Sequence, residues 1–216
     1  MLFRSFALTR SVFSERSALW ASVCAAVIGG DYFLRSSLGF TDHHCAEVLL
    51  TTTALAFTAK ACSATDARQA RRLSAAAGLS LGAYLLTWGG GSLFVAVLVV
   101  WAAMETLIAH AQGGSGRPLV RIVATMFGLA AVMILPWWNT RPTFGYDLMA
   151  LALGASAIPA IDAIAAMSVR RGYSIRSLLT VVGLIGLVAS ALVWLAIQLV
   201  VPDLIWQMGQ IGRAHV

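Results

Sequence analysis

Long apolar stretches separated by short polar segments run along almost the whole chain. Seven such stretches can be distinguished, and most approach the roughly 20 residues that a helix needs to cross a bilayer. The pattern therefore predicts an all-α, polytopic membrane protein with about seven helical segments. These lie at approximately residues 18–34, 47–61, 73–86, 92–111, 120–138, 148–167 and 178–201.

Local features of this pattern modify the predicted length, regularity or packing of individual helices. The stretches at 47–61 and 73–86 are short for a membrane span, so we expect flanking polar residues to extend both helices. The first stretch is interrupted by Gly29-Gly30-Asp31, which predicts that its outer end is irregular or re-entrant. Small residues at 154–156 and at Gly183 and Gly186 predict close helix packing.

Composition agrees with a membrane protein. The chain of 216 residues is 59% hydrophobic and 11% charged, with a mean hydropathy of +0.83. The net charge of +6 comes mainly from arginine, and no aromatic-interleaved basic surface indicates nucleic-acid binding. Three scattered cysteines do not predict a disulfide framework.

The basic residues are distributed unevenly between alternate loops. One set of loops carries nine Lys and Arg residues, whereas the other carries two, Arg35 and Arg141. The nine are Lys60, Arg68, Arg71, Arg72, Arg117, Arg121, Arg170, Arg171 and Arg176. Since basic loops favour the cytoplasmic side, residues 42–47 are predicted to lie on the extracytoplasmic face. An aromatic belt at the same boundary supports this orientation: Trp88, Trp137, Trp138 and Trp206.

Residues 42–47 (Asp-His-His-Cys-Ala-Glu) crowd several metal-ligand side chains into the start of an apolar stretch. Carboxylate and imidazole together suit a divalent cation of the magnesium, manganese or zinc type. Asp42 and His44 do not face each other on a regular helix, but they can converge on one ion in a turn before a helix that begins near Cys45. The alternative is that Asp42 caps this helix and the histidines are solvated.

The sequence around this cluster resembles a known family. Residues 35–47 (Arg-Ser-Ser-Leu-Gly-Phe-Thr-Asp-His-His-Cys-Ala-Glu) resemble the second acidic-motif region of single-subunit oligosaccharyltransferases of the archaeal and bacterial type. The shared pattern is Arg followed by Ser or Thr, Gly four residues after the Arg, and an Asp-centred motif before a helix. Residues 84–94 resemble the tight outer turn of the same family, and the likeness covers most of residues 10–205.

The resemblance implies the membrane domain of a C-type glycosyltransferase, with residues 6–210 as a part of it. Such enzymes transfer an oligosaccharide from a polyprenyl-linked phosphate or diphosphate carrier to the side-chain amide of an acceptor asparagine. The implied partners are this lipid-linked glycan, an acceptor polypeptide and the lipid bilayer. The implied location is a prokaryotic plasma membrane.

The family motif also implies roles for individual residues. Asp42 and His44 match the second metal-binding motif, with Mn²⁺ or Mg²⁺ as the expected cation, and Arg35 matches an arginine that lines the catalytic pocket. An amide nitrogen is a poor nucleophile and the leaving phosphate develops charge, so a divalent cation has a clear chemical use there. His43 and Glu47 match common residues of the family without an assigned role.

Some family features are expected outside this sequence. Residues 1–5 and 211–216 resemble translated sequencing adapters, so we expect both segments to be non-native. The family's first acidic motif belongs before residue 6, and its later Glu motif and its soluble domain belong after residue 210. Trp137-Trp138-Asn139 is assigned to the aromatic belt and not to the soluble-domain signature. We therefore expect the chain to be inactive by itself.

Two alternatives remain open from the sequence. The first is another lipid-carrier-dependent sugar transferase of the same fold. The second is a membrane metal-binding or transport protein that uses residues 42–45 as a zinc site. Glu105 and Asp162 lie near the predicted cytoplasmic helix ends, where arginine or water is expected to satisfy them. Tyr146 and Asp147 are expected in a solvated outer loop, with a border of the substrate path as the alternative.

Overall fold

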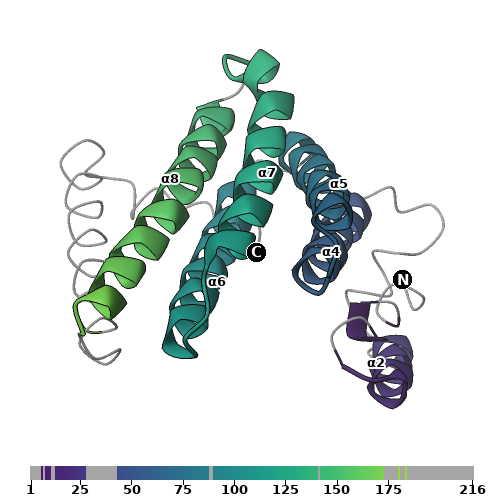
Figure 1. Ribbon diagram of the computed structural model, residues 1–216. Coiled ribbons are helices and arrows are strands. Elements are labelled where there is room, and N and C mark those ends of the chain that lie inside the picture. Colours follow the sequence, from purple (N-terminus) through teal and green to yellow (C-terminus); the bar gives the residue numbers. More distant parts are fainter. Residues whose placement is uncertain are drawn as a thin grey trace. The chain divides into compact units, whose positions relative to one another are not determined.

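The computed structural model describes residues 6, 8–10, 13–27, 43–87, 90–140, 142–172, 180 and 183, with backbone alone at 25–27, 43–45 and 142. Within these residues all regular structure is helical and there is no strand (Figure 1). The elements are α2 (Glu15–Val27), α4 (His43–Cys62), α5 (Ala67–Thr87), α6 (Gly91–Ala111), α7 (Arg117–Ile134), the 3₁₀ helix η1 (Leu135–Trp137) and α8 (Pro142–Arg170). The predicted all-α fold is confirmed.

Six of the seven predicted stretches coincide with these helices. The two short stretches are extended by polar flanks as expected, since α4 has 20 residues and α5 has 21. α2 ends at Val27, and the break at Gly29-Gly30-Asp31 lies outside the described residues. The seventh stretch also lies outside them, except for Thr180 and Gly183.

Three helical segments are long and apolar enough to cross a membrane: Gly91–Ala111, Arg117–Trp137 and Thr143–Arg170. Large apolar side chains on their surfaces are exposed, including Leu93 on α6 at 74% and Met149 on α8 at 70%. Water-soluble monomers rarely expose large contiguous apolar surfaces, whereas lipid tails accommodate them. The protein is therefore a multi-pass membrane protein.

Several helix ends have identifiable local causes. The Asp66 carboxylate accepts hydrogen bonds from the backbone N–H groups of Arg68 (3.2 Å) and Gln69 (3.0 Å), which caps the start of α5. Pro118 is the second residue of α7, where its missing N–H has no helical partner to lose. Gly113 follows α6 with a φ of +76°, a left-handed conformation that glycine adopts without strain.

α4 carries a run of three threonines within its apolar stretch. The hydroxyls of Thr51, Thr52 and Thr53 each donate to the backbone carbonyl four residues earlier, at 2.5 to 2.8 Å. A hydroxyl that is bonded to its own helix costs much less to bury in hydrocarbon than an unpaired one. α4 can therefore lie within the membrane despite this polar run.

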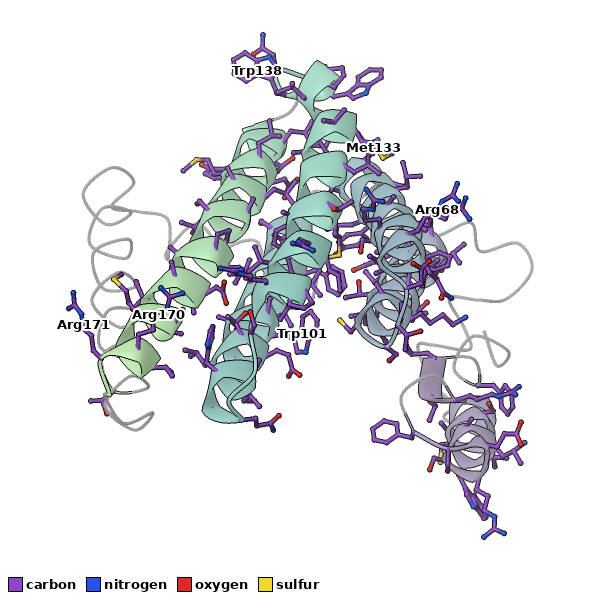
Figure 2. All side chains as sticks on the ribbon, in the orientation of Figure 1. Arg68, Trp101, Met133, Trp138, Arg170 and Arg171 are labelled. Atoms are coloured by element: carbon purple, nitrogen blue, oxygen red, sulfur yellow. The ribbon has the colours of Figure 1, made fainter. Side chains whose placement is uncertain are left out.

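α5 packs closely against both α4 and α7. Within residues 1–164, the first of two compact units, the contact between α5 and α7 depends on glycine. A Cβ at Gly78 would lie 2.6 Å from the Met126 carbonyl oxygen, and one at Gly82 would lie 2.7 Å from the Met133 sulfur (Figure 2). The absence of side chains at these two positions lets the two helix backbones approach.

The predicted small-residue contacts are confirmed at one position and not at another. A Cβ at Gly154 of α8 would lie 2.5 Å from both Phe127 on α7 and Val99 on α6, so this glycine does permit close packing. No atom of the described residues lies within 4 Å of the position of a Cβ at Gly183, so the predicted contact there stays a prediction. Gly186 lies outside the described residues.

Candidate functional site

The predicted metal motif lies at the start of α4. The helix begins at His43, two residues earlier than the predicted start near Cys45, so His43 and His44 belong to its first turn. Asp42 and Arg35 lie outside the described residues, as do the side chains of His43 and His44. Among the described residues no three His, Cys, Asp or Glu side chains come together as a metal site. The pairing of Asp42 with His44 therefore stays a prediction.

We call the outer end the part of the molecule where α4, α6 and α8 begin and α5 ends. One buried aromatic side chain connects these elements electrostatically. Tyr84, near the end of α5, is 4% exposed and interacts with the charges of Glu47 on α4 and Asp147 on α8. Its ring also packs edge-to-face on Phe94 of α6, with 5.5 Å between the ring centroids. Tyr84 is thus in ring contact with α6 and interacts electrostatically with acidic groups on α4 and α8.

Asp147 does not lie in a solvated loop, so the expectation for this residue is wrong. α8 begins at Pro142, and this places Asp147 in its second turn with a fully buried side chain. Neither carboxylate oxygen has a hydrogen-bond partner among the described residues. The Ser92 backbone N–H, at the start of α6, interacts with the carboxylate electrostatically but without hydrogen-bond geometry. A helix start favours negative charge, which offsets part of the cost of burial.

The outer end therefore holds two acidic side chains, Glu47 and Asp147, in addition to the Asp-His-His motif. Glu47 is half-buried on the same helix as His43 and His44, and Asp147 approaches from α8. Such buried acidic and phenolic groups are rare within membrane domains and usually accompany a polar substrate path or a functional site. Tyr146, the neighbour of Asp147, is 65% exposed but also lies in α8, so its expected position in a loop is wrong as well.

A second polar contact lies at the opposite ends of α6 and α8. The His110 Nε2 is 2.7 Å from the Asp162 Oδ1, and the two side chains are 6% and 15% exposed. The expectation that arginine or water satisfies Asp162 is therefore wrong. A Cβ at Gly116 would collide with this carboxylate, so glycine at the start of α7 leaves room for the pair.

We expect that removal of one partner of this pair lowers the free energy of unfolding more than replacement of both partners by apolar residues. His110→Ala leaves a buried carboxylate without its partner, which should lower the free energy of unfolding by about 1–3 kcal/mol. The double variant His110→Leu/Asp162→Leu should recover most of this loss, since apolar groups of similar size can replace a buried pair. Thermal unfolding of the purified protein in detergent measures both effects.

The control is Glu105→Ala, which removes an exposed carboxylate from the same helix. This variant should stay within about 0.5 kcal/mol of the unsubstituted protein. A double variant less stable than His110→Ala would contradict the interpretation and indicate that the polar pair itself holds α6 against α8.

Comparison with known proteins identifies the family. Residues 4–201 match the model of the N-terminal part of the oligosaccharyl transferase STT3. Among curated proteins, dolichyl-phosphooligosaccharide-protein glycotransferase 3 of Archaeoglobus fulgidus is 28% identical over 169 residues, which are 72% of this chain and 19% of that protein. This chain thus spans about a fifth of the length of that relative.

Solved structures of Archaeoglobus fulgidus oligosaccharyltransferase have the same fold. One, in complex with zinc and sulfate, has a TM-score of 0.75 and 24% identity over 91% of this chain and 27% of that one. Another, with an inhibitory peptide and a dolichol-phosphate, has a TM-score of 0.73 and 25% identity over 88% of this chain and 24% of that one. Because the family model covers nearly the whole sequence, the chain belongs to the STT3 family of oligosaccharyl transferases.

Proposed function

We propose that this chain forms part of the membrane domain of an oligosaccharyltransferase that moves a lipid-linked glycan onto acceptor asparagine. The observation that carries the proposal is the family match over residues 4–201, which includes the Asp-His-His motif at the start of α4. Family membership favours a transferase over a metal transporter. The curated relative is named as a glycotransferase that acts on protein.

In this proposal Asp42 and His44 bind a divalent cation, Mg²⁺ or Mn²⁺. One carboxylate and one imidazole are a donor set that suits such ions and also zinc, which is present in one Archaeoglobus structure. A bound cation would neutralise the charge that develops on the leaving phosphate. The planar guanidinium of Arg35 would pair with phosphate or carboxylate oxygens, and the start of α4 adds a partial positive charge.

The proposed substrates are a polyprenyl phosphate- or diphosphate-linked oligosaccharide and a polypeptide with an acceptor asparagine. Support comes from a related structure that contains a dolichol-phosphate and an inhibitory peptide, and from another that is tethered to a peptide with the sequence NVT. The acidic groups around Tyr84 would border the path of one of these substrates at the outer end.

The direct test is glycan transfer by the full-length gene product. The purified protein in detergent or lipid is supplied with a lipid-linked glycan, an Asn-X-Thr peptide and Mn²⁺ or Mg²⁺. We expect glycopeptide that disappears on chelation and returns when metal is added. The 216-residue chain assayed alone should give none, since the relative is about four times longer. Absence of glycopeptide from folded, metal-loaded full-length preparations would contradict the proposal.

We also propose that the outer end faces the extracytoplasmic side of a prokaryotic plasma membrane. After replacement of Cys24, Cys45 and Cys62 by serine, a cysteine introduced at Thr41 or Thr140 should react with an impermeant maleimide added outside. A cysteine introduced at Ala67 or Gly172 should react only after permeabilisation, because basic loops remain in the cytoplasm. Labelling of intact cells measures this. Reaction at Ala67 in intact cells would reverse the orientation.

A further inference from the structure

A cavity of about 510 Å³ lies where α4 ends and where α5 and α7 begin. Its volume is within the ~300–1,000 Å³ that small-ligand sites occupy. Most of the wall is apolar or small, and two arginines line it, Arg71 from α5 and Arg121 from α7. The other residues of the wall include Ala61, Ala67, Ser74, Pro118 and Ile122. We call this cavity the arginine pocket.

The two guanidinium groups in the arginine pocket have no counter-charge among the described residues. Neither Arg71 nor Arg121 forms an ion pair with another described side chain. The Asp66 carboxylate is engaged by two backbone N–H groups of α5. Glu105 of α6 interacts electrostatically with Cys62, which lines the pocket. The pocket wall itself carries two positively charged side chains and no carboxylate.

The packing of α5 against α7 places both arginines on the wall of one pocket, although like charges repel each other. Gly78 and Gly82 fix α5 against α7 in a parallel arrangement, and Arg71 precedes Gly78 by two helical turns on the same face. α5 and α7 begin at the pocket and α4 ends there, so the positive ends of two helices outweigh the negative end of one. Two arginines and this net positive helix charge around one concave surface form a site that favours an anion.

We infer that the arginine pocket binds the phosphate group of an anionic phospholipid. Three helical segments of this protein are long and apolar enough to span a bilayer, and the pocket lies at the start of one of them, α7, where lipid headgroups are found. The guanidinium groups would donate charge-assisted hydrogen bonds to the phosphate oxygens. Ala61, Ala67 and Ile122 would contact the glycerol and the first acyl carbons, which free phosphate lacks.

The test measures binding of short-chain lipids to the purified full-length protein in an uncharged detergent. The probes are dioctanoyl-phosphatidylglycerol, dioctanoyl-phosphatidylcholine and inorganic phosphate, each titrated by calorimetry. Arg71→Gln/Arg121→Gln should weaken phosphatidylglycerol binding about thirtyfold, because the loss of each basic residue should lower the affinity roughly fivefold. The charge-preserving Arg71→Lys/Arg121→Lys should retain most of the binding, which excludes loss of fold as the cause.

The matched control is Arg68→Gln/Arg117→Gln, which removes two arginines from the first turns of the same helices but not from the pocket wall. Arg68 projects outward from α5 (Figure 2). This control should change phosphatidylglycerol affinity by less than about threefold. Equal weakening by both pairs, equal affinity for phosphatidylcholine, or equal affinity for inorganic phosphate would each overturn the assignment to an anionic lipid.

Discussion

Asp42→Ala in the full-length protein is expected to lower glycan transfer by about 100- to 1,000-fold, the range found when one group that stabilises developing charge is removed. The substitution removes the only carboxylate of the Asp-His-His motif. Arg35→Ala should have an effect of similar size, because it removes the cation expected to face phosphate or carboxylate oxygens. Initial rates with a lipid-linked glycan and an Asn-X-Thr peptide measure both losses.

A metal titration separates ligand loss from a general loss of structure. Asp42→Asn should need more Mn²⁺ or Mg²⁺ for half-maximal rate, whereas Arg35→Ala should not change the metal requirement. Asp66→Asn is the control, since it neutralises a carboxylate that caps α5 and leaves the cap intact. Near-normal transfer by well-expressed Asp42→Ala would mean that Asp42 serves only as the cap of α4.

Gly78→Leu is expected to prevent α5 from packing against α7. Even a Cβ at this position would lie 2.6 Å from the Met126 carbonyl oxygen, and backbone atoms cannot move aside as a flexible side chain can. Overpacking costs about 1–3 kcal/mol for added methylenes, and a leucine against backbone should exceed that range. We expect little folded protein by size-exclusion chromatography in detergent, with most of the material aggregated.

Gly128→Leu is the matched control for this prediction. Gly128 lies on α7, and no atom lies within 4 Å of the position that a Cβ would occupy there. Because leucine favours the helix by somewhat less than 1 kcal/mol relative to glycine, this variant should be as stable as the unsubstituted protein or more so. If both variants folded equally well, close contact between α5 and α7 would not hold this part of the membrane domain together.

The positions of the helices could be predicted from the sequence, and the reason is chemical. A bilayer requires about 20 apolar residues per span, so hydropathy alone located six of the helices that the structure describes. Helix ends were less certain, since polar residues at the boundary can join a helix or leave it. α4 includes His43 and His44 in its first turn for this reason.

Contacts between helices were not predictable from the sequence. Asp147 looks like part of a polar turn after Arg141-Pro142, and nothing local indicates that it is buried and interacts with Tyr84 and the start of α6. The partner of Asp162 is His110, 52 residues away. Hydropathy gives the apolar face of a helix but not the helix that covers this face. The proline at the start of α8 was the one local signal for Asp147, because proline is common in first turns.

The motif residues were found through a family pattern and not through geometry. The spacing of Asp42 and His44 is compatible with both a metal site and a capped helix. We favour the metal site in our proposal because residues 35–47 resemble the acidic-motif region of the family. The resemblance to the family rests on the order of Arg35, Gly39 and Asp42, and none of these residues alone would indicate the family.

The packing of α5 between α4 and α7 has a consequence for how the protein enters the membrane during synthesis. α6, α7 with η1, and α8 are apolar enough to partition into lipid individually, whereas α5, which carries three arginines near its start, is not among the described helices that reach this threshold. Four residues connect α4 to α5, and α5 buries one face against α4 and another against α7. We therefore expect the α4–α5 hairpin to leave the translocon late, as a pair, once α7 has emerged to receive it.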